Sequence, residues 1–303
     1  MQYSCGNWTG NQAQKILMID KILKTLDINA TIKEISVKPF VSSEDGSDYN
    51  TWLLSYKDKR YVLKKAKNFE TEIYANLLKN VSEGAPKYVA DFSFDNEQYL
   101  IIEYIDGTDL CKCTRDSLIK AIDALIAIQE QYWNDTAHQN VGFSFDKSLK
   151  GRIKRGEYLG DTELEAAYSE FISLYSTLPR TLCHDDLLPF NVIVGKEKAY
   201  LIDWEYAGIL PYPTSISRLI AHAEEGEEAF FYMSDEDKAF AIDYYYKSFI
   251  KGKRISYNDY IKAIDSFLLY EYCEWIMLGN RYENSDKERA RIYFEKAKAH
   301  LNK

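Results

Sequence analysis

The chain contains few cysteines, and their placement forms no recognisable pattern. There are five among its 303 residues. They are Cys5, Cys111, Cys113, Cys183 and Cys273, an odd and scattered set without a C-x-x-C pair. We therefore expect neither a disulfide framework nor a zinc site, and a reducing cytoplasm suits this cysteine usage best.

A long apolar segment is also missing. The strongest apolar run is YLIIEYI at 99–105, which is interrupted by Glu103 and is far too short to span a bilayer. The first residues, MQYSCGNWTGNQAQKILMID, contain no basic segment followed by a long apolar one, so we expect no signal peptide. These absences predict a soluble, cytoplasmic protein without a membrane partner.

Positive charge is in deficit as well. The chain has 38 Lys and Arg against 47 Asp and Glu, a net charge of −9. This balance disfavours binding to nucleic acid through phosphate contacts, and it favours cationic ligands over anionic ones. Because 46% of the residues are hydrophobic, a packed core is expected, and the length suits one large domain or two lobes.

The order of the predicted elements divides the chain near residue 106. A helix at 11–27 precedes short strands at 31–40, 49–56 and 60–66, which read as a β-meander. A helix at 68–81, with Asn68 as its N-cap, and strands at 88–96 and 97–105 complete this half. After Gly107 the pattern is helical, at 114–133, at 161–178 and from about 235 onward. We therefore expect one lobe at 1–105 and a helical lobe at 106–303.

One strand signal stands inside the helical half, after the motif HDDLLPFN at 184–191. The runs VIV (192–194) and AYLI (199–202) are joined by GKEK and predict a β-hairpin. Asn191 precedes the first strand and Asp203 follows the second, so antiparallel pairing brings both to the open end of the hairpin. An amide oxygen and a carboxylate held together in this way suit Mg²⁺.

Asp186 lies in the loop that leads into this hairpin, where it can face whatever the metal holds. It precedes Asn191 by five residues, and Asp203 follows Asn191 by twelve. In protein kinases an aspartate five residues before an asparagine orients the acceptor hydroxyl, and a later aspartate holds Mg²⁺. The arrangement predicts phosphoryl transfer. The resemblance to kinases implies that Asp186 is the catalytic base, or at least the residue that orients the substrate hydroxyl.

These motifs give the chain a resemblance to a known family. HDDLLPFN followed by LIDWEYAG (201–208) resembles the aminoglycoside phosphotransferase and choline kinase family, and YVLK (61–64) and LIIEYIDG (100–107) resemble its other segments in the right order. The resemblance runs from about residue 31 to 220. It implies an α+β, two-lobed protein-kinase-like fold, with an antiparallel sheet in the N-terminal lobe and a mainly helical C-terminal lobe.

The resemblance also implies a nucleotide site. Lys64 would contact the α and β phosphates, Val62 the adenine, and the backbone of Glu103 and Ile105 the edge of the base. Glu72 would form the ion pair with Lys64. Two alternatives stay open at this point: Glu70 competes with Glu72, and Lys65 competes with Lys64, although strand alternation places Lys64 on the same face as Val62.

Three segments depart from the family pattern. The expected phosphate loop, VSSEDGSDY (41–49), has a single glycine, and we read it as a turn that offers Ser43 and the backbone at Gly46 to the phosphates. SISRL (215–219) stands where the family usually carries an aspartate before the next helix, so that anchor is missing or replaced. The role of Asp185 stays open.

The function that we expect is phosphorylation, by ATP and Mg²⁺, of a hydroxyl on a small cationic molecule, most plausibly an aminoglycoside-like amino sugar. GTP is not excluded as the donor. Acidic residues at 224–237, with Glu271 and Glu274, would attract such a polycation. Choline or ethanolamine kinase activity is the rival, for which Tyr270, Tyr272 and Trp275 are candidate cage residues. A catalytically silent kinase-fold binding protein is the alternative from another class.

Overall fold

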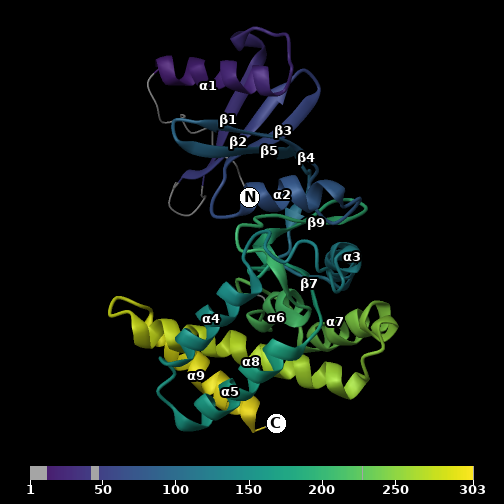
Figure 1. Ribbon diagram of the computed structural model, residues 1–303, viewed down its shortest axis with the longest axis vertical. Coiled ribbons are helices and arrows are strands. Elements are labelled where there is room, and N and C mark those ends of the chain that lie inside the picture. Colours follow the sequence, from purple (N-terminus) through teal and green to yellow (C-terminus); the bar gives the residue numbers. More distant parts are fainter. Residues whose placement is uncertain (1–11, 42–47, 227, 303) are drawn as a thin grey trace.

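A strand-rich lobe stands above a larger helical lobe in the computed structural model of the protein (Figure 1). The structure describes residues 12–41, 48–226 and 228–302. In the N-terminal lobe, helix α1 (Gln12–Thr25) is followed by the strands of one sheet. These are β1 (Ile35–Val41), β2 (Asp48–Tyr56), β3 (Lys59–Lys65), β4 (Tyr88–Phe94) and β5 (Glu97–Glu103). The expected helix and all five expected strands are present.

The sheet has the order β1-β2-β3-β5-β4, and every neighbouring pair is antiparallel. Because side chains alternate along a strand, β3 divides its residues between two cores. Leu63 packs with Leu54 and Ile101 in a cluster that also contains Met18 and Ile22 of α1. Val62 packs on the opposite face, in the cluster that continues into the helical lobe. The functional face of β3 is therefore the one that faces away from α1.

Helix α2 (Glu70–Asn76) is shorter than the sequence predicts, and it continues as a 3₁₀ turn at Leu78–Asn80. Its N-cap is Phe69 and not Asn68, so that expectation is wrong. Asn68 instead adopts a positive φ of 45° and donates its side-chain amide to Glu205 Oε2 at 3.1 Å. The Asn68 side chain therefore forms a hydrogen bond to the helical lobe instead of capping α2.

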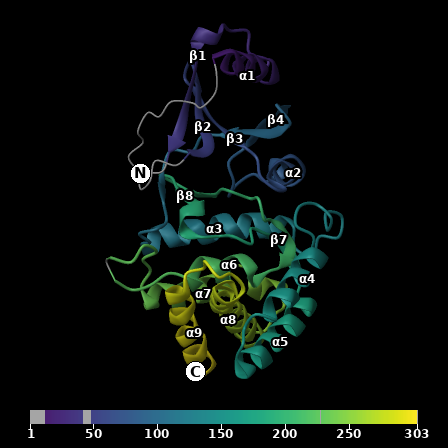
Figure 2. The same ribbon diagram turned by 90° about the vertical axis from the view of Figure 1, so that its left-hand side faces the viewer.

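The helical lobe contains seven α-helices within the described residues. They are α3 (Arg115–Gln131), α4 (Phe145–Gly156), α5 (Thr162–Thr177), α6 (Pro213–Ala221), α7 (Asp235–Ser248), α8 (Tyr257–Arg281) and α9 (Lys287–Leu301). Thr114 caps α3 as expected, since its side chain accepts a hydrogen bond from Ser117 N. Sequence patterning missed α4 and α6, both of which are short. Figure 2 shows α3 lying between the hairpin strand β8 and the remaining helices.

The expected hairpin is present as β8 (Val192–Val194) and β9 (Ala199–Leu201), paired antiparallel with Val192 opposite Leu201. It is not the lone strand signal of this lobe. The short strand β6 (Thr108–Asp109) pairs with β8, and β7 (Arg180–Cys183) pairs with β10 (Gly208–Pro211). The segment between β7 and β8 carries the HDDLLPFN motif, so two small sheets hold its two ends.

A backbone hydrogen bond at one glycine connects the strand-rich lobe to the hairpin. Gly84 has a φ of +90°, and its carbonyl accepts a hydrogen bond from Leu201 N of β9 at 2.8 Å. A Cβ at this position would lie 2.4 Å from the carbonyl oxygen of Ala124 in α3. Both the backbone conformation and the close approach therefore require glycine here.

We predict that Gly84→Ala lowers the free energy of unfolding by at least about 2 kcal/mol, because alanine is strained at this φ and collides with backbone. Gly151→Ala is the matched control: it lies within α4 with nothing inside 4 Å of the added Cβ, so it should be neutral or slightly stabilising. Denaturant unfolding of both variants measures the difference, and equal stabilities would contradict the close approach.

Candidate active site

A buried ion cluster joins the two lobes. Lys64 Nζ lies 2.9 Å from Glu70 Oε1, and it also pairs with Asp203 Oδ1 from the segment after β9. The Lys64 side chain is 12% exposed and that of Glu70 is 1% exposed. Burial raises the pKa of Glu70 to about 7, although Lys64 acts in the opposite direction. Two carboxylates thus share one ammonium group at the lobe junction.

Glu70, and not Glu72, is the ion partner of Lys64. This corrects the expectation placed on Glu72 and settles the alternative in favour of Glu70. Glu70 is the first residue of α2 and is buried, whereas Glu72 is partly exposed. Successive helical residues are turned by about 100°, so residues two apart point to nearly opposite sides of a helix. The connection between Lys64 and α2 is short, so the first residue of the helix, Glu70, lies next to Lys64. Glu72 then faces away from Lys64.

The choice between Lys64 and Lys65 follows from strand alternation. Lys65 pairs with Glu97 at 2.9 Å, across the sheet from the lobe junction. Lys64 shares its face with Val62, which packs against the core cluster that spans both lobes. The structure therefore brings Lys64 and Val62 together at the candidate nucleotide site and leaves Lys65 outside it.

The open end of the hairpin has the expected arrangement. Ile202 N donates to Asn191 O at 2.9 Å, which places Asp203 next to Asn191. Asn191 is buried, and its amide nitrogen donates to the carbonyl oxygen of Asp186 at 2.9 Å. That bond leaves the amide oxygen as the ligand atom. Asp203 has a φ of 68°, a left-handed conformation that turns its carboxylate out of the strand direction towards Lys64.

These oxygen atoms fit a magnesium ion. An amide oxygen and a carboxylate are hard donors of the kind that Mg²⁺ takes in nucleotide sites, usually alongside phosphate oxygens and water. Within residues 12–41, 48–226 and 228–302 no group of three or more His, Cys, Asp or Glu side chains is arranged to hold a metal by itself. A site with few protein ligands is what a metal that arrives with a nucleotide requires.

Asp186 lies beside a guanidinium group. Its Oδ1 accepts a hydrogen bond from Arg218 Nη2 at 2.9 Å, and its side chain is 27% exposed. Burial raises the pKa of Asp186 to about 6, while Arg218 acts to lower it. Among the described residues no donor is bonded to the second oxygen, Oδ2, which is the atom free for an acceptor hydroxyl.

Arg218 in turn connects Asp186 to helix α8. Its Nη1 donates to Glu271 Oε2 at 2.7 Å and to Glu274 Oε2 at 2.8 Å. Arg155 of α4 is a second partner of Glu274. These contacts bear on the expectation that Glu271 and Glu274 would attract a polycationic acceptor. Glu271 and Glu274 do lie near Asp186, but guanidinium groups already neutralise them.

The neighbouring Asp185, whose role was open, takes part in a buried structural contact. Its Oδ1 lies 2.5 Å from Arg152 Nη2, and Asp185 adopts a positive φ of 56°. The Arg152 guanidinium lies between the rings of Tyr175 and Tyr270, 4.7 Å from each centroid. Asp185 therefore fixes the catalytic loop to α4 and α5, and Tyr270 is core rather than part of an open cage.

The charged groups around Asp186 carry a net negative charge when all are ionised. Ion pairs connect four carboxylates to three guanidinium groups: Asp185, Asp186, Glu271 and Glu274 with Arg152, Arg155 and Arg218. Counted by themselves these groups leave one negative charge, next to His222, whose Nε2 lies 3.3 Å from Glu271 Oε2. Such a surplus favours a cation, because an uncompensated buried charge is costly.

The anchor that SISRL was expected to lack is replaced by a serine. Ser215 Oγ accepts a hydrogen bond from the backbone N–H of His184 at 2.9 Å, and both residues are fully buried. The other contact of His184 runs between its Nε2 and the Ile202 carbonyl, at 2.6 Å. Burial lowers the pKa of His184 to about 4, so the neutral ring donates this bond. His184 is thus a structural support of the loop.

The remaining predicted residues lie at the hinge or outside the described chain. Glu103 ends β5, and its N–H donates to the Lys87 carbonyl at 2.9 Å. Ile105 follows in the irregular segment between the sheet and β6. Both therefore lie where the two lobes meet. Ser43 and Gly46 of the expected phosphate loop lie outside the described residues.

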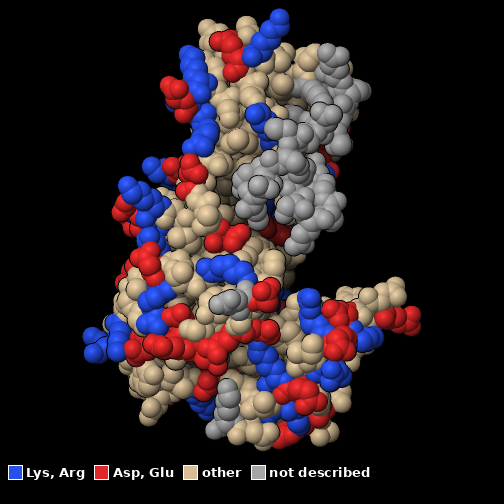
Figure 3. Space-filling model, turned by 180° about the vertical axis from the view of Figure 1, so that it is seen from behind, with Lys and Arg blue, Asp and Glu red and all other residues tan. Residues whose placement is uncertain are grey.

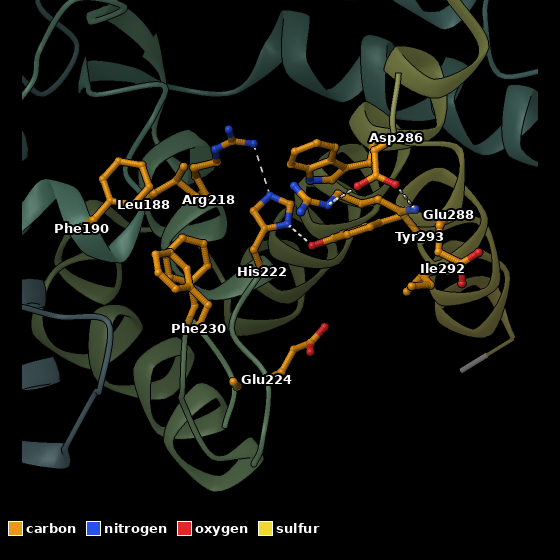
Figure 4. A pocket seen from close by; sticks show the side chains of 14 residues that line it. Leu188, Phe190, Arg218, His222, Glu224, Phe230, Asp286, Glu288, Ile292 and Tyr293 are labelled. Carbon is orange, nitrogen blue, oxygen red and sulfur yellow. Dashed lines mark hydrogen bonds and ion pairs between the residues drawn. The ribbon is translucent and has the colours of Figure 1, made fainter. Parts of the chain in front are cut away.

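A cavity of about 620 Å³ opens beside the catalytic loop. Leu188, two residues after Asp186, and Arg218 belong to its wall (Figure 4). Five aromatic side chains line it: Phe190, Phe230, Phe231, Trp275 and Tyr293. Figure 4 shows His222 between Arg218 and Tyr293, hydrogen-bonded to both. Of the three proposed cage residues, Trp275 lines this cavity and Tyr270 and Tyr272 do not.

Acidic side chains are prominent outside the cavity as well. Figure 3 shows a band of Asp and Glu across the helical lobe on the face drawn there. Glu224, from the acidic run at 224–237, lines the cavity. The structure thus places one part of that run at the candidate acceptor site.

No helix in the described part of the chain is both long and apolar enough to cross a membrane.

Sequence reasoning missed three residues that build this site: Arg152, Ser215 and Arg218. Arg218 and Ser215 stand within the segment that departs from the family pattern, which was the available signal. Arg152 lies in the helix that patterning did not detect.

The fold is two-lobed and protein-kinase-like, and its candidate site combines the Lys64–Glu70 ion pair with Asp186 in the loop before β8 and with oxygen atoms at the end of the hairpin. The sequence comparison agrees, since residues 42–229 match the model of the phosphotransferase enzyme family. The match covers more than half of the chain, and the protein belongs to this family. The expectations of family and fold class are confirmed.

The similar proteins include choline kinases and aminoglycoside phosphotransferases. The Protein LicA homolog of Mycoplasma capricolum is 30% identical over 152 residues, which is 48% of this chain and 58% of that protein. The choline kinase LicA of Streptococcus pneumoniae has a TM-score of 0.59 at 18% identity, covering 96% of this chain and 99% of the other. An aminoglycoside-3'-phosphotransferase of type VIII has a TM-score of 0.55 at 16% identity, covering 82% and 98%. At such identities the structures establish the fold alone.

We predict that Ser215→Ala lowers the free energy of unfolding by about 1–3 kcal/mol, because it leaves the buried N–H of His184 without a partner. Ser217→Ala is the matched control. Ser217 is equally buried in α6, but its hydroxyl has no hydrogen-bond partner among the described residues, so its loss should be neutral or stabilising. Thermal unfolding compares the two, and equal destabilisation would remove Ser215 from the role of anchor.

Proposed function

We propose that the protein transfers the γ-phosphoryl group of ATP, bound with Mg²⁺, to a hydroxyl of a small cationic molecule. The nucleotide would bind to the lobe at 1–105 and the acceptor to the lobe at 106–303. Support comes from the ion pair of Lys64 with Glu70 and from the oxygen pair at the hairpin end, which meet at the lobe junction. GTP is not distinguished from ATP by any contact of the chain.

Each residue has a defined task under this proposal. Lys64 contacts the phosphates and Glu70 fixes its ammonium group, while Asn191 and Asp203 hold the metal. When bound, Mg²⁺ neutralises charge on the phosphate oxygens. Asp186 orients the acceptor hydroxyl and takes its proton as the new bond to phosphorus forms.

The nucleotide base and the outer phosphates would meet residues near the hinge and on the sheet. Val62 packs on the face of β3 that carries Lys64 and is placed to contact the adenine. The backbone of Glu103 and Ile105 would pair with the edge of the base, and Ser43 and Gly46 would cover the phosphates. These assignments rest on the family resemblance.

The aromatic cavity beside Asp186 is the observation that most supports our choice of acceptor class. Aromatic faces attract quaternary and substituted ammonium groups, and five aromatic side chains surround a volume suited to a small molecule. The Arg289 guanidinium lies 4.5 Å from the Trp275 ring centroid, so an acceptor ammonium group would share this ring with a side-chain cation. We therefore favour a compact amino alcohol of the choline or ethanolamine type over the amino sugar that the acidic composition first suggested.

A polycationic amino sugar is the second candidate. Glu224, Asp286 and Glu288 line the cavity and would pair with additional ammonium groups. Two of them already have local partners, however, because Asp286 pairs with Arg289 at 3.4 Å and Glu288 with Arg291 at 3.0 Å. This leaves fewer acidic groups for a polycation than the sequence suggests.

The kinase activity predicts a separation of two functions. Asp186→Asn should lower kcat by at least about 100-fold while nucleotide affinity changes little, because Asp186 acts on the acceptor and not on the metal. Asp203→Ala should abolish the Mg²⁺-dependent part of nucleotide binding. Steady-state turnover and calorimetry with and without Mg²⁺ measure the two effects.

Asp243→Asn is the control for this pair, since Asp243 lies on α7 in an ion pair with Lys247, and it should behave as wild type. Near-normal turnover of Asp186→Asn would remove Asp186 from catalysis. Unchanged Mg²⁺ enhancement in Asp203→Ala would reject the hairpin-end metal site. A wild-type protein that never consumes ATP with any acceptor would favour the silent binding protein.

The choice of acceptor is tested at the cavity. Trp275→Leu should raise the KM for choline about threefold to thirtyfold, the range that follows from losing a cation–π contact, with the KM for ATP unchanged. Tyr282→Ala is the control: Tyr282 also carries an arginine over its ring, at 5.0 Å, but is not part of the cavity wall.

The same assay is run with choline, ethanolamine, aminoglycosides and neutral sugars at two salt concentrations. A polycation's KM should rise steeply with ionic strength and that of choline only slightly. Efficient turnover of aminoglycosides with a steep salt dependence would move the assignment to the amino sugar. Preference for a neutral acceptor would overturn the cationic class.

A further inference from the structure

Arg218 occupies the only described position from which one side chain touches both Asp186 and helix α8. It projects from α6, whose side chains are mostly buried. Its Nη1 is held by Glu271 and Glu274 at 2.7 and 2.8 Å, and its Nη2 donates to Asp186 Oδ1 at 2.9 Å. Residues distant in the sequence thus converge on one guanidinium group.

The planar geometry of the Arg218 guanidinium determines the direction of its hydrogen bonds as well as the position of its charge. A guanidinium is planar, and its N–H vectors are fixed relative to one another. Because two carboxylates of α8 hold Nη1, the direction in which Nη2 points is also determined. The bond to Asp186 therefore fixes one carboxylate oxygen and sets the orientation of the other, Oδ2.

The rigidity of the supporting groups makes this arrangement specific. Glu271 is 3% exposed and also contacts His222 at 3.3 Å. Glu274 accepts a hydrogen bond from Tyr270 at 3.1 Å. Neither carboxylate can follow a moving Arg218 without breaking buried contacts. α8 is thus a fixed platform for the guanidinium.

We propose that Arg218 is a positioning residue for phosphoryl transfer, which holds the Asp186 carboxylate so that Oδ2 faces the acceptor hydroxyl. The inference rests on the proposed function, since it assigns a partner to the residue that acts on the acceptor. It adds that the platform on α8, and not the catalytic loop alone, determines where Asp186 points.

A lysine in the same place would keep the positive charge but lose the orientation. Its ammonium group is a single point of charge on a flexible stem, and it does not offer two nitrogens held in one plane. The charge-conserving change is therefore the informative one. Removing the charge altogether would leave Glu271 buried without a cation, which is strongly destabilising.

The experiment compares Arg218→Lys with Arg155→Lys. Arg155 shares Glu274 with Arg218 and is also largely buried, but it does not contact Asp186. We expect Arg218→Lys to lower kcat roughly 10- to 100-fold, the cost of a small misplacement of a reacting group, with acceptor KM and nucleotide affinity nearly unchanged. Arg155→Lys should retain wild-type kcat, and thermal unfolding should show both variants folded.

The decisive measurement adds Asp186→Asn to the comparison. If Arg218 acts through Asp186, then Arg218→Lys should cause no further loss of kcat in the Asp186→Asn background. A multiplicative further loss, or an Arg155→Lys variant as slow as Arg218→Lys, would show a purely structural role and overturn the inference. So would an Arg218→Lys variant with wild-type kcat.

The two proposals fail in different ways. An Asp186→Asn variant that turns over like wild type rejects the proposed role of Asp186, and the inference falls with it. A wild-type enzyme that is active and an Asp186→Asn variant that is not, combined with an Arg218→Lys variant of normal kcat, reject the inference alone. Substrate turnover with the full chain provides all of these readouts.

Discussion

The contact of Lys64 with Glu70 and Asp203 is the constraint on which the rest of the site depends, because it is where the two lobes share buried charge. Its members come from β3, from α2 and from the segment after the hairpin. Two carboxylates compete for one ammonium group. Burial raises the pKa of Glu70 to about 7, and the neighbouring charge of Asp203 adds to this, while Lys64 acts in the opposite direction. Under the proposed function a divalent cation at Asp203 would make up the deficit, and the lobe junction would be most stable when the nucleotide and its metal are bound.

The geometry of the hairpin end follows from local rules that can be read in the sequence. Asn191 and Asp203 are adjacent because two short strands with a tight turn allow one register, which the pairing of Val192 with Leu201 confirms. The strands of the N-terminal lobe and the choice of Lys64 over Lys65 follow in the same way from alternation along β3. Patterns that span a few residues were sufficient for these features.

Tertiary contacts determined what the sequence did not predict. Asn68 is a good N-cap by composition, but its amide bonds Glu205 of the other lobe instead. The sequence left Glu70 and Glu72 as alternatives, because the start of α2 depends on how the chain leaves the sheet. All residues of the short strands β7 and β10 except Arg180 are buried. Buried and exposed positions therefore do not alternate, and no period distinguishes these strands from a loop. Arg218 could not be assigned, since its three acidic partners lie 32, 53 and 56 residues away.

At SISRL, two residues of the buried helix α6 together hold the loop that carries Asp186. An aspartate in this position would serve as an anchor with a charge of its own. Here Ser215 accepts the backbone N–H of His184 without charge, and Arg218, one turn further along α6, holds the Asp186 side chain. The loop is thus held by its backbone at His184 and by the side chain of Asp186. Because a neutral hydroxyl replaces a carboxylate at the anchor, α6 can place a guanidinium among three carboxylates without an additional buried negative charge beside it.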